Sequence, residues 1–302
     1  MAKEKNQSEI SSVRRAKHGG ILTVIFAIVS FLWISPILIV FLNSFKRKAY
    51  IFTHPFSPSA NSLSEGWDKF VSGIERAMCG WLNYSNGIRK TNLWGCFGNS
   101  LFITVGSVAL IILCCSMTAW YITRVHTKAT KAIYVMCLFS MIVPFQMVMF
   151  TLSKFANILH LSNPLGIIIV YLGFGAGLAV FMFTGFVKGI SLEIEEAAMI
   201  DGCSPLQTFF KVVFPILKPT TVTVAILEAM WVWNDYLLPY LVLSSKYRTI
   251  PIAVQYLKQS HGQIDWGAMM AVLVLAILPI IIFYIACQKY IIEGVLAGAV
   301  KG

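Results

Sequence analysis

The chain has 302 residues, of which 57% are hydrophobic and only 12% are charged. A soluble domain usually carries roughly 25% charged residues, so this composition excludes a soluble enzyme, a disordered chain and a secreted disulfide scaffold. The net charge is +11, but no basic helix carries interleaved aromatic residues. We therefore expect no nucleic acid partner, and we expect the basic loops to meet the headgroups of a lipid bilayer.

Six apolar segments are long enough to cross a bilayer core of about 30 Å as helices. They cover about residues 21–43, 97–123, 132–153, 164–187, 219–243 and 267–288. The first follows a basic stretch and no small-residue cleavage site comes after it, so we interpret it as an uncleaved signal anchor. The sequence predicts an all-α integral membrane protein with six transmembrane helices.

The predicted organisation follows from these spans. We expect an N-terminal tail (1–20), a first helix (21–43), an extracytoplasmic loop or cap (44–95), a five-helix core (96–290) and a C-terminal tail (291–302). Lysine and arginine are nearly balanced between the two sets of loops, so charge alone leaves the orientation open. A disulfide between Cys79 and Cys96 is left open, whereas the scattered histidines and the absence of a CxxC pair predict no metal site.

The polar segment 188–218 predicts two short helices joined by a sharp bend. Ser191 is placed to cap the first helix, and the acidic residues Glu193 and Glu195 suit the positive end of its dipole. By themselves these two carboxylates are expected to be only solvated. Gly202 is placed to end the helix in the left-handed conformation.

The second helix of this segment has its own start signals. Ser204 is followed by Pro205 and Gln207, the pattern of a capping box with proline at the first helical position. Ala197 and Ala198 give the first helix a small-residue face, which permits close approach of another protein. The segment is therefore expected to protrude into a groove of a partner.

The spacing within this segment resembles a known motif. Glu196-Ala197-Ala198, three residues, Gly202, nine residues and Val212-x-Phe214-Pro215 are similar to the EAA loop of permease subunits of bacterial ABC importers. Other stretches resemble the maltose-type (MalG-like) carbohydrate branch of that family, namely residues 99–100, 119–124, 144–146, 233–239, 249–251, 265–267 and 293–302.

The resemblance implies a type I ABC importer in a bacterial inner (plasma) membrane, with both termini cytoplasmic. The implied partners are a second permease subunit, two ATPase subunits and an extracytoplasmic sugar-binding protein. The residues implied to dock on an ATPase are Glu196, Ala197, Ala198, Asp201 and Gly202. The chain has no GxxxxGK[ST] loop, so it is expected to hold no cofactor and to be no enzyme, with ATP and Mg bound by the partner ATPase.

Four residues near the fifth span are candidates for a substrate pathway. Glu228 is an acid in the middle of an apolar helix, which fits either a sugar-hydroxyl acceptor or a structural carboxyl at a subunit interface. Trp231, Asn234 and Asp235 form a polar-aromatic cluster together with Trp233, which fits either a sugar pathway or an interfacial aromatic belt before a kink. The alternative function is an ion-coupled secondary transporter that uses Glu228 and Asp235. An intramembrane enzyme would need a catalytic pair, which the sequence does not offer.

Overall fold

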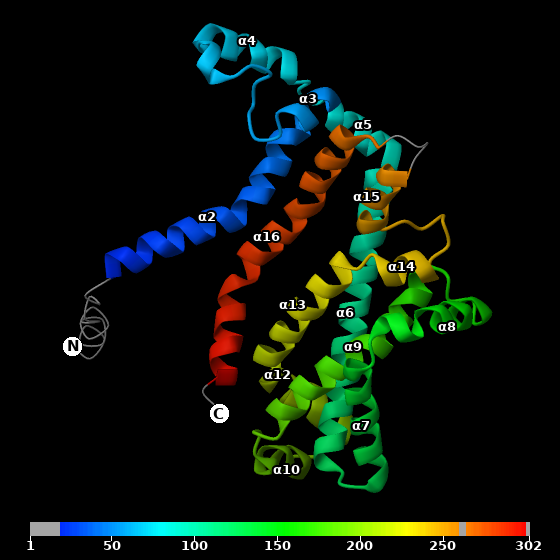
Figure 1. Ribbon diagram of the computed structural model, residues 1–302. Coiled ribbons are helices and arrows are strands. Elements are labelled where there is room, and N and C mark those ends of the chain that lie inside the picture. Colours follow the sequence, from blue (N-terminus) through cyan, green and yellow to red (C-terminus); the bar gives the residue numbers. More distant parts are fainter. Residues whose placement is uncertain (1–18, 260–263, 300–302) are drawn as a thin grey trace. The chain divides into compact units, whose positions relative to one another are not determined.

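The computed structural model describes residues 19–259 and 264–299 (Figure 1). Within these residues every regular element is a helix, apart from an isolated antiparallel bridge between Lys46 and Met78. The chain divides into two compact units, Met1–Asn83 and Tyr84–Gly302. Residues 1–18 and 300–302, which belong to the two predicted tails, lie outside the described residues.

The first unit joins a long apolar helix to a small helical cap. Its helices are α2 (Gly19–Ser44), α3 (Lys48–Thr53), the 3-10 helix η1 (Leu63–Glu65) and α4 (Trp67–Ala77). Lys46 is fully buried at the end of α2, where its Nζ donates to Asn43 Oδ1 at 3.0 Å and to the His54 carbonyl at 2.8 Å. Burial lowers the pKa of this lysine. The cap is thus held by buried polar contacts as well as by apolar packing.

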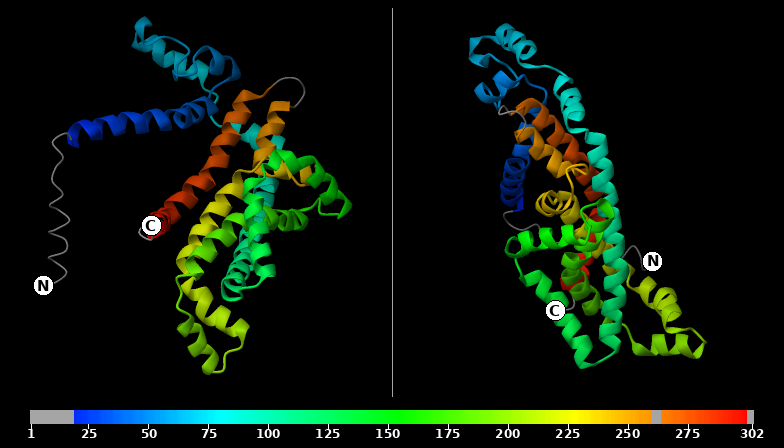
Figure 2. Two further views of the ribbon diagram at one scale, coloured as in Figure 1. Left: turned by 60° about the horizontal axis from the view of Figure 1, so that its bottom comes forward. Right: turned by 90° about the vertical axis from the view of Figure 1, so that its right-hand side faces the viewer.

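The second unit holds the remaining spans. Its helices are α6 (Leu93–Arg124), α7 (Lys128–Ile142), α8 (Phe145–Ile158), α9 (Pro164–Val187), α10 (Leu192–Ile200), α11 (Pro205–Thr208), the π-helix η2 (Phe209–Val213), α12 (Phe214–Ile216), α13 (Lys218–Asn234), α14 (Leu237–Val242), α15 (Ile250–Gln259) and α16 (Trp266–Ala299), while α5 (Leu82–Thr91) leads into it. The long helices α6 and α9 lie side by side and form its most extensive helix pair (Figure 1 and Figure 2). Both α7 and α13 pack against this pair.

Four helices, α2, α6, α9 and α16, are each long and apolar enough to cross a membrane. Two bent helix pairs would add up to two further spans, if each pair is counted as one span: α7 with α8, and the segment Pro205–Ile216 with α13, which is bent by 77°. The predicted third span, 132–153, is divided into α7 and α8, which meet at 108°. Pro144 lies at the break and removes a helical N–H, while the residue before a proline is driven out of the helical region.

The predicted fifth span is also interrupted. Its helix α13 ends at Asn234, and α14 restarts at Leu237. Asp235 has an extended backbone (φ −71°, ψ 123°), and its Oδ1 accepts the N–H of Leu237 at 3.0 Å, so the aspartate caps the second piece. The predicted span 219–243 is therefore divided into two helices, and the break lies at Asp235, before Pro239.

Polar residues at the start of α6 fasten the chain that leads into α15. Asn99 Nδ2 donates to the Arg248 carbonyl at 3.1 Å, and the Ile250 N–H donates to Ser100 Oγ at 2.9 Å. Both are non-local hydrogen bonds that satisfy backbone groups away from water. The two residues thus fix the end of the unit that carries α14 and α15.

The disulfide left open by the sequence does not form, since Cys79 and Cys96 are both free. Cys79 Sγ donates to the Phe45 carbonyl at 3.3 Å, and Cys96 Sγ donates to the Thr91 carbonyl at 3.3 Å. Burial raises the pKa of the Cys79 thiol. Each thiol therefore has a local acceptor.

Candidate functional site

The segment 191–208 folds as two short helices around a sharp turn, which we call the bend. Ser191 Oγ accepts the Glu193 N–H at 3.3 Å at the start of α10. At the other end, the Cys203 N–H donates to the Ala198 carbonyl at 3.0 Å across Gly202, whose φ is +87°. This left-handed value favours glycine, which is why the helix ends here.

The second half of the bend starts as its sequence predicts. Ser204 Oγ accepts the Gln207 N–H at 3.4 Å, and Gln207 Oε1 accepts the Ser204 N–H at 2.9 Å. This capping box satisfies two amides at the start of α11. The chain then passes through the π-helical turn η2. The predicted start of this helix is therefore present in the structure.

Most of the predicted docking residues lie on the surface of the bend. Glu196, Ala197, Asp201 and Gly202 are exposed, whereas Ala198 is only 9% exposed and packs inward. Large apolar side chains are exposed beside them: Met199, Ile200, Leu206 and Phe210. Small and apolar groups gathered on a protruding surface are typical of a protein interface.

A buried ion pair fixes the bend to α6. Glu195 is 1% exposed, and its Oε1 accepts from Arg124 Nη2 at 2.7 Å and from Arg124 Nε at 3.0 Å. Its other oxygen, Oε2, accepts from Trp120 Nε1 at 2.9 Å. We call these three residues the clamp. The expectation that Glu195 is only solvated was wrong, because its carboxylate is buried and paired. Its partners lie 71 and 75 residues earlier in the chain, so the local sequence does not reveal them.

The clamp also reaches the end of α9. Arg124 Nη2 donates to the Ile190 carbonyl at 3.0 Å, close to the end of that helix. One guanidinium thus joins α6, the residues after α9, and α10. Buried charges of this kind need such multiple hydrogen bonds to offset their desolvation.

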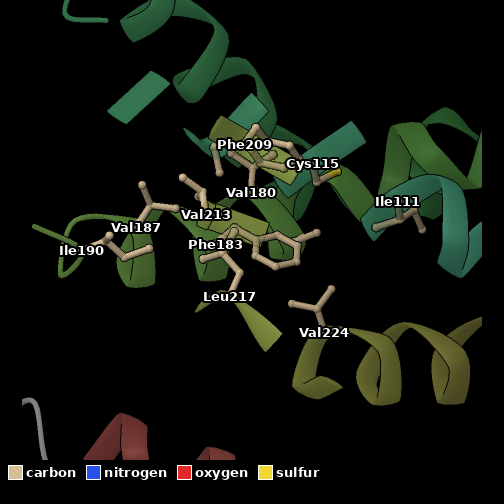
Figure 3. Close-up of a cluster of buried hydrophobic side chains, with 12 residues drawn as sticks. Ile111, Cys115, Val180, Phe183, Val187, Ile190, Phe209, Val213, Leu217 and Val224 are labelled. Atoms are coloured by element: carbon tan, nitrogen blue, oxygen red, sulfur yellow. The ribbon is translucent and has the colours of Figure 1, made fainter. Parts of the chain in front are cut away.

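Apolar packing also holds the bend against α6 and α9. Phe209, Val213 and Leu217 are fully buried, and they contact a core that α6 and α9 supply (Figure 3). The ring centroids of Phe209 and Trp120 lie 5.4 Å apart, so the aromatic packing meets the clamp. Because a packed core resists deformation, a force on the bend is transmitted to α6 and α9.

The four candidate pathway residues lie over the last two turns of α13 and the break that follows it. Glu228 is 1% exposed on α13, and neither of its oxygens has a hydrogen-bond partner among the described residues. A Cβ added at Gly175 of α9 would lie 2.9 Å from Glu228 Oε2. The carboxyl is therefore enclosed where α9 and α13 pack together, which favours a packing role for it.

The other three residues lie near the break between α13 and α14. Tyr171 joins two of them, since its hydroxyl donates to Asp235 Oδ2 at 3.0 Å and its ring lies edge-on to Trp231 at 5.4 Å. Asn234 is exposed and donates to the Met230 carbonyl at 2.7 Å. A pathway role for these residues stays a prediction.

Sequence reasoning missed an aromatic cavity of about 380 Å³ beside α14 and α15. Its lining includes Tyr236 and Tyr240, whose rings stack at 5.2 Å, and Tyr256, whose ring lies 4.1 Å from the Arg248 guanidinium. The concentration of tyrosines over 236–256 is the signal that could have found it. The cavity lies beyond the C-terminal end of α13, whereas the bend leads into the N-terminal end of that helix.

Comparison with known proteins decides the family. Residues 111–296 match the model of the binding-protein-dependent transport system inner membrane component. The chain is also 38% identical over 282 residues to the probable starch degradation products transport system permease protein AmyC of Thermoanaerobacterium thermosulfurigenes, covering 93% of this chain and 96% of that one. The chain belongs to this permease family. It is a multi-pass inner membrane protein and a component of a binding-protein-dependent ABC transporter complex.

Two further likenesses agree with this assignment. This permease is 32% identical over 292 residues to the melibiose/raffinose/stachyose import permease protein MelC of Bacillus subtilis, covering 95% of this chain and 99% of that one. Its fold matches a chain from the crystal structure of a bacterial ABC transporter involved in the import of the acidic polysaccharide alginate, with a TM-score of 0.71 at 21% identity and 92% and 98% of the two chains covered. The fold is thus that of an ABC importer permease.

Proposed function

We propose that this permease supplies half of the translocation pathway of an ATP-driven oligosaccharide importer in a bacterial plasma membrane. A second permease subunit supplies the other half, two ATPase subunits bind ATP and Mg, and an extracytoplasmic binding protein delivers the sugar. The bend faces the cytoplasm in this proposal, so both termini are cytoplasmic as well.

The docking role is supported by two features together: the surface of the bend is exposed, and its buried side is held firmly against α6 and α9. Glu196, Ala197, Asp201 and Gly202 are presented on the surface, with Ala198 packed beneath them. The clamp and the buried aromatic residues fix this surface to α6 and α9. Movement of a docked ATPase would therefore move the spans as a rigid body, which is what alternating access requires.

The sugar substrate is proposed from two kinds of support. The relatives named above are described as permeases for starch degradation products and for melibiose, raffinose and stachyose. The cavity beside α14 offers aromatic faces together with hydrogen-bonding groups, and such a combination suits the apolar faces and the hydroxyls of a sugar ring. We place the sugar pathway at the C-terminal end of α13, where Trp231, Asn234 and Asp235 lie next to the segment that forms this cavity.

Family membership decides against the ion-coupled alternative, because the family model is that of a binding-protein-dependent system. The geometry of the two acids agrees. Glu228 is enclosed in helix packing, and Asp235 accepts hydrogen bonds from Tyr171 and from the first residue of α14. Neither carboxyl is among the residues that line the cavity beside α14 and α15.

A steric block on the bend tests the docking role. Ala197→Trp adds a large side chain to the exposed face of α10, and Ala132→Trp adds the same group to an exposed alanine of α7. We expect the first variant to co-purify with much less ATPase subunit and to lose ATP-dependent sugar uptake. The second variant should retain both. Normal ATPase stoichiometry in Ala197→Trp would refute the docking role.

A further inference from the structure

A basic cavity of about 580 Å³ lies between α7, the C-terminal end of α6 and the C-terminal end of α9. Three lysines line it, namely Lys128 and Lys131 at the start of α7 and Lys188 at the end of α9, and His126 lines it as well. No acidic side chain is among the described residues that line it. Three exposed lysines thus line one hollow without a carboxylate among its lining residues, which favours an anionic ligand.

Hydroxyl groups and the N-terminus of α7 also line this cavity, and both can interact favourably with an anion. Thr184 of α9 lines the cavity and is 3% exposed, and its Oγ1 has no hydrogen-bond partner among the described residues. Thr127 and Lys128, at the N-terminus of the 15-residue helix α7, line it as well. The positive end of the helix dipole thus points to the same hollow, as in many phosphate sites.

The neighbouring surface indicates where the anion comes from. Beyond Lys128 and Lys131, α7 continues as a membrane-facing helix with exposed apolar side chains, including Ile133 at 42% and Met136 at 73% exposure. A phosphate in the cavity would therefore lie at the level of the headgroups, with acyl chains along α7. Basic pockets between transmembrane helices are suited to anionic headgroups in this way.

We propose that this cavity binds the phosphate group of an anionic phospholipid. The three lysines provide the charge, Thr184 provides a hydroxyl donor, and the first turn of α7 provides the dipole. The site stands on the geometry of α6, α7 and α9 alone, and it is independent of what docks on the bend. A bound lipid would join α7 to α9 next to the clamp.

The test is lipid binding by the assembled importer, purified through a tag on this permease and delipidated in detergent. Phosphatidylglycerol, phosphatidylcholine and inorganic phosphate are titrated separately, and bound molecules are counted by native mass spectrometry. We compare wild type with the triple variant Lys128→Gln/Lys131→Gln/Lys188→Gln and with Thr184→Val. Lys218→Gln is the matched control, because this exposed lysine begins α13 and does not line the cavity.

We expect wild type to retain phosphatidylglycerol in preference to phosphatidylcholine. The triple variant should bind it on the order of 100-fold more weakly, since each lysine near an anionic headgroup contributes about fivefold. Thr184→Val should weaken binding about tenfold, which is the effect of one lost hydrogen bond to a charged group. Lys218→Gln should bind like wild type. If the triple variant fails to assemble, the three single lysine variants take its place.

The remaining outcomes are also decisive. Binding of inorganic phosphate without phosphatidylglycerol would support the phosphate chemistry and replace the lipid by a soluble source. Equal phosphatidylglycerol binding by wild type and the triple variant would overturn the proposal. Loss of the ATPase subunit from the triple variant with unchanged lipid binding would also overturn it, because the lysines would then face a protein partner.

Discussion

The clamp offers the most informative perturbation of this permease. Removing Arg124 leaves Glu195 buried with one remaining side-chain partner, the indole N–H of Trp120. Glu193 lies two positions earlier in the same helical turn and is exposed. The two acids therefore form a matched pair, in which the same change removes either a buried interaction or a solvated charge.

The expected magnitude follows from the burial of the pair. Breaking a buried ion pair by removing one partner costs about 3–5 kcal/mol. Since the Arg124 side chain is 19% exposed, we take the lower end, about 3 kcal/mol. This corresponds to an increase on the order of 100-fold in the population in which α10 is detached from α6.

The measurement is amide hydrogen exchange over residues 193–203 in the assembled importer. We expect Arg124→Met to accelerate exchange on the order of 100-fold, and Glu195→Gln to accelerate it less, because its amide still accepts from Trp120. Glu193→Gln should exchange like wild type. Sugar-stimulated ATP hydrolysis should fall in the same order. Equal exchange in Arg124→Met and Glu193→Gln would refute the mechanical role of the clamp.

Three further substitutions test other parts of the structure. Gly202→Val should strain the turn at Gly202, whose φ is +87°, by about 1–2 kcal/mol and should weaken co-purification of the ATPase subunit. Gly185→Val, at a position of α9 with nothing within 4 Å, should leave co-purification unchanged. Equal recovery of the ATPase subunit by the two variants would contradict this prediction. Gly175→Ala should lower the thermal unfolding midpoint, because the added Cβ would lie 2.6 Å from Ile111 Cδ1. Gly173→Ala, with nothing within 4 Å of the added Cβ, should leave the midpoint unchanged. Equal midpoints for the two variants would contradict the close packing of α9 at Gly175. Glu228→Gln should retain assembly and sugar uptake, because the side chain is enclosed; a raised transport KM would instead assign Glu228 to the pathway.

The sequence predicts local features of the bend well. The caps at Ser191 and Ser204 and the turn at Gly202 depend on residues within a few positions of one another, so their signals are complete in a short window. The apolar lengths of α2, α6, α9 and α16 are likewise properties of continuous segments. Helices α2, α6 and α9 appear close to their predicted limits, whereas α16 runs on to Ala299 and includes residues 291–299 of the predicted C-terminal tail.

Interactions between distant segments were not predictable in the same way. In the sequence, Glu195 and Glu193 look alike, since both are acidic residues in the first turn of the same predicted helix. Only the packing of α6 against this helix makes Glu195 the buried partner of Arg124. The division of the third span at Pro144 depends on whether a proline kinks a helix or breaks it, which neighbouring helices decide. The Tyr171–Asp235 contact joins residues 64 positions apart.

The most direct test of the central claim is cross-linking from the bend to the ATPase subunit. Ala197→Cys is introduced at the exposed face of α10, and the importer is treated with a short thiol-to-amine cross-linker that does not require a cysteine on the partner. The unsubstituted protein controls for the seven native cysteines. We expect a covalent product between this permease and the ATPase that only Ala197→Cys gives. No such product in a complex that transports sugar and hydrolyses ATP would contradict the claim that the bend is the docking surface.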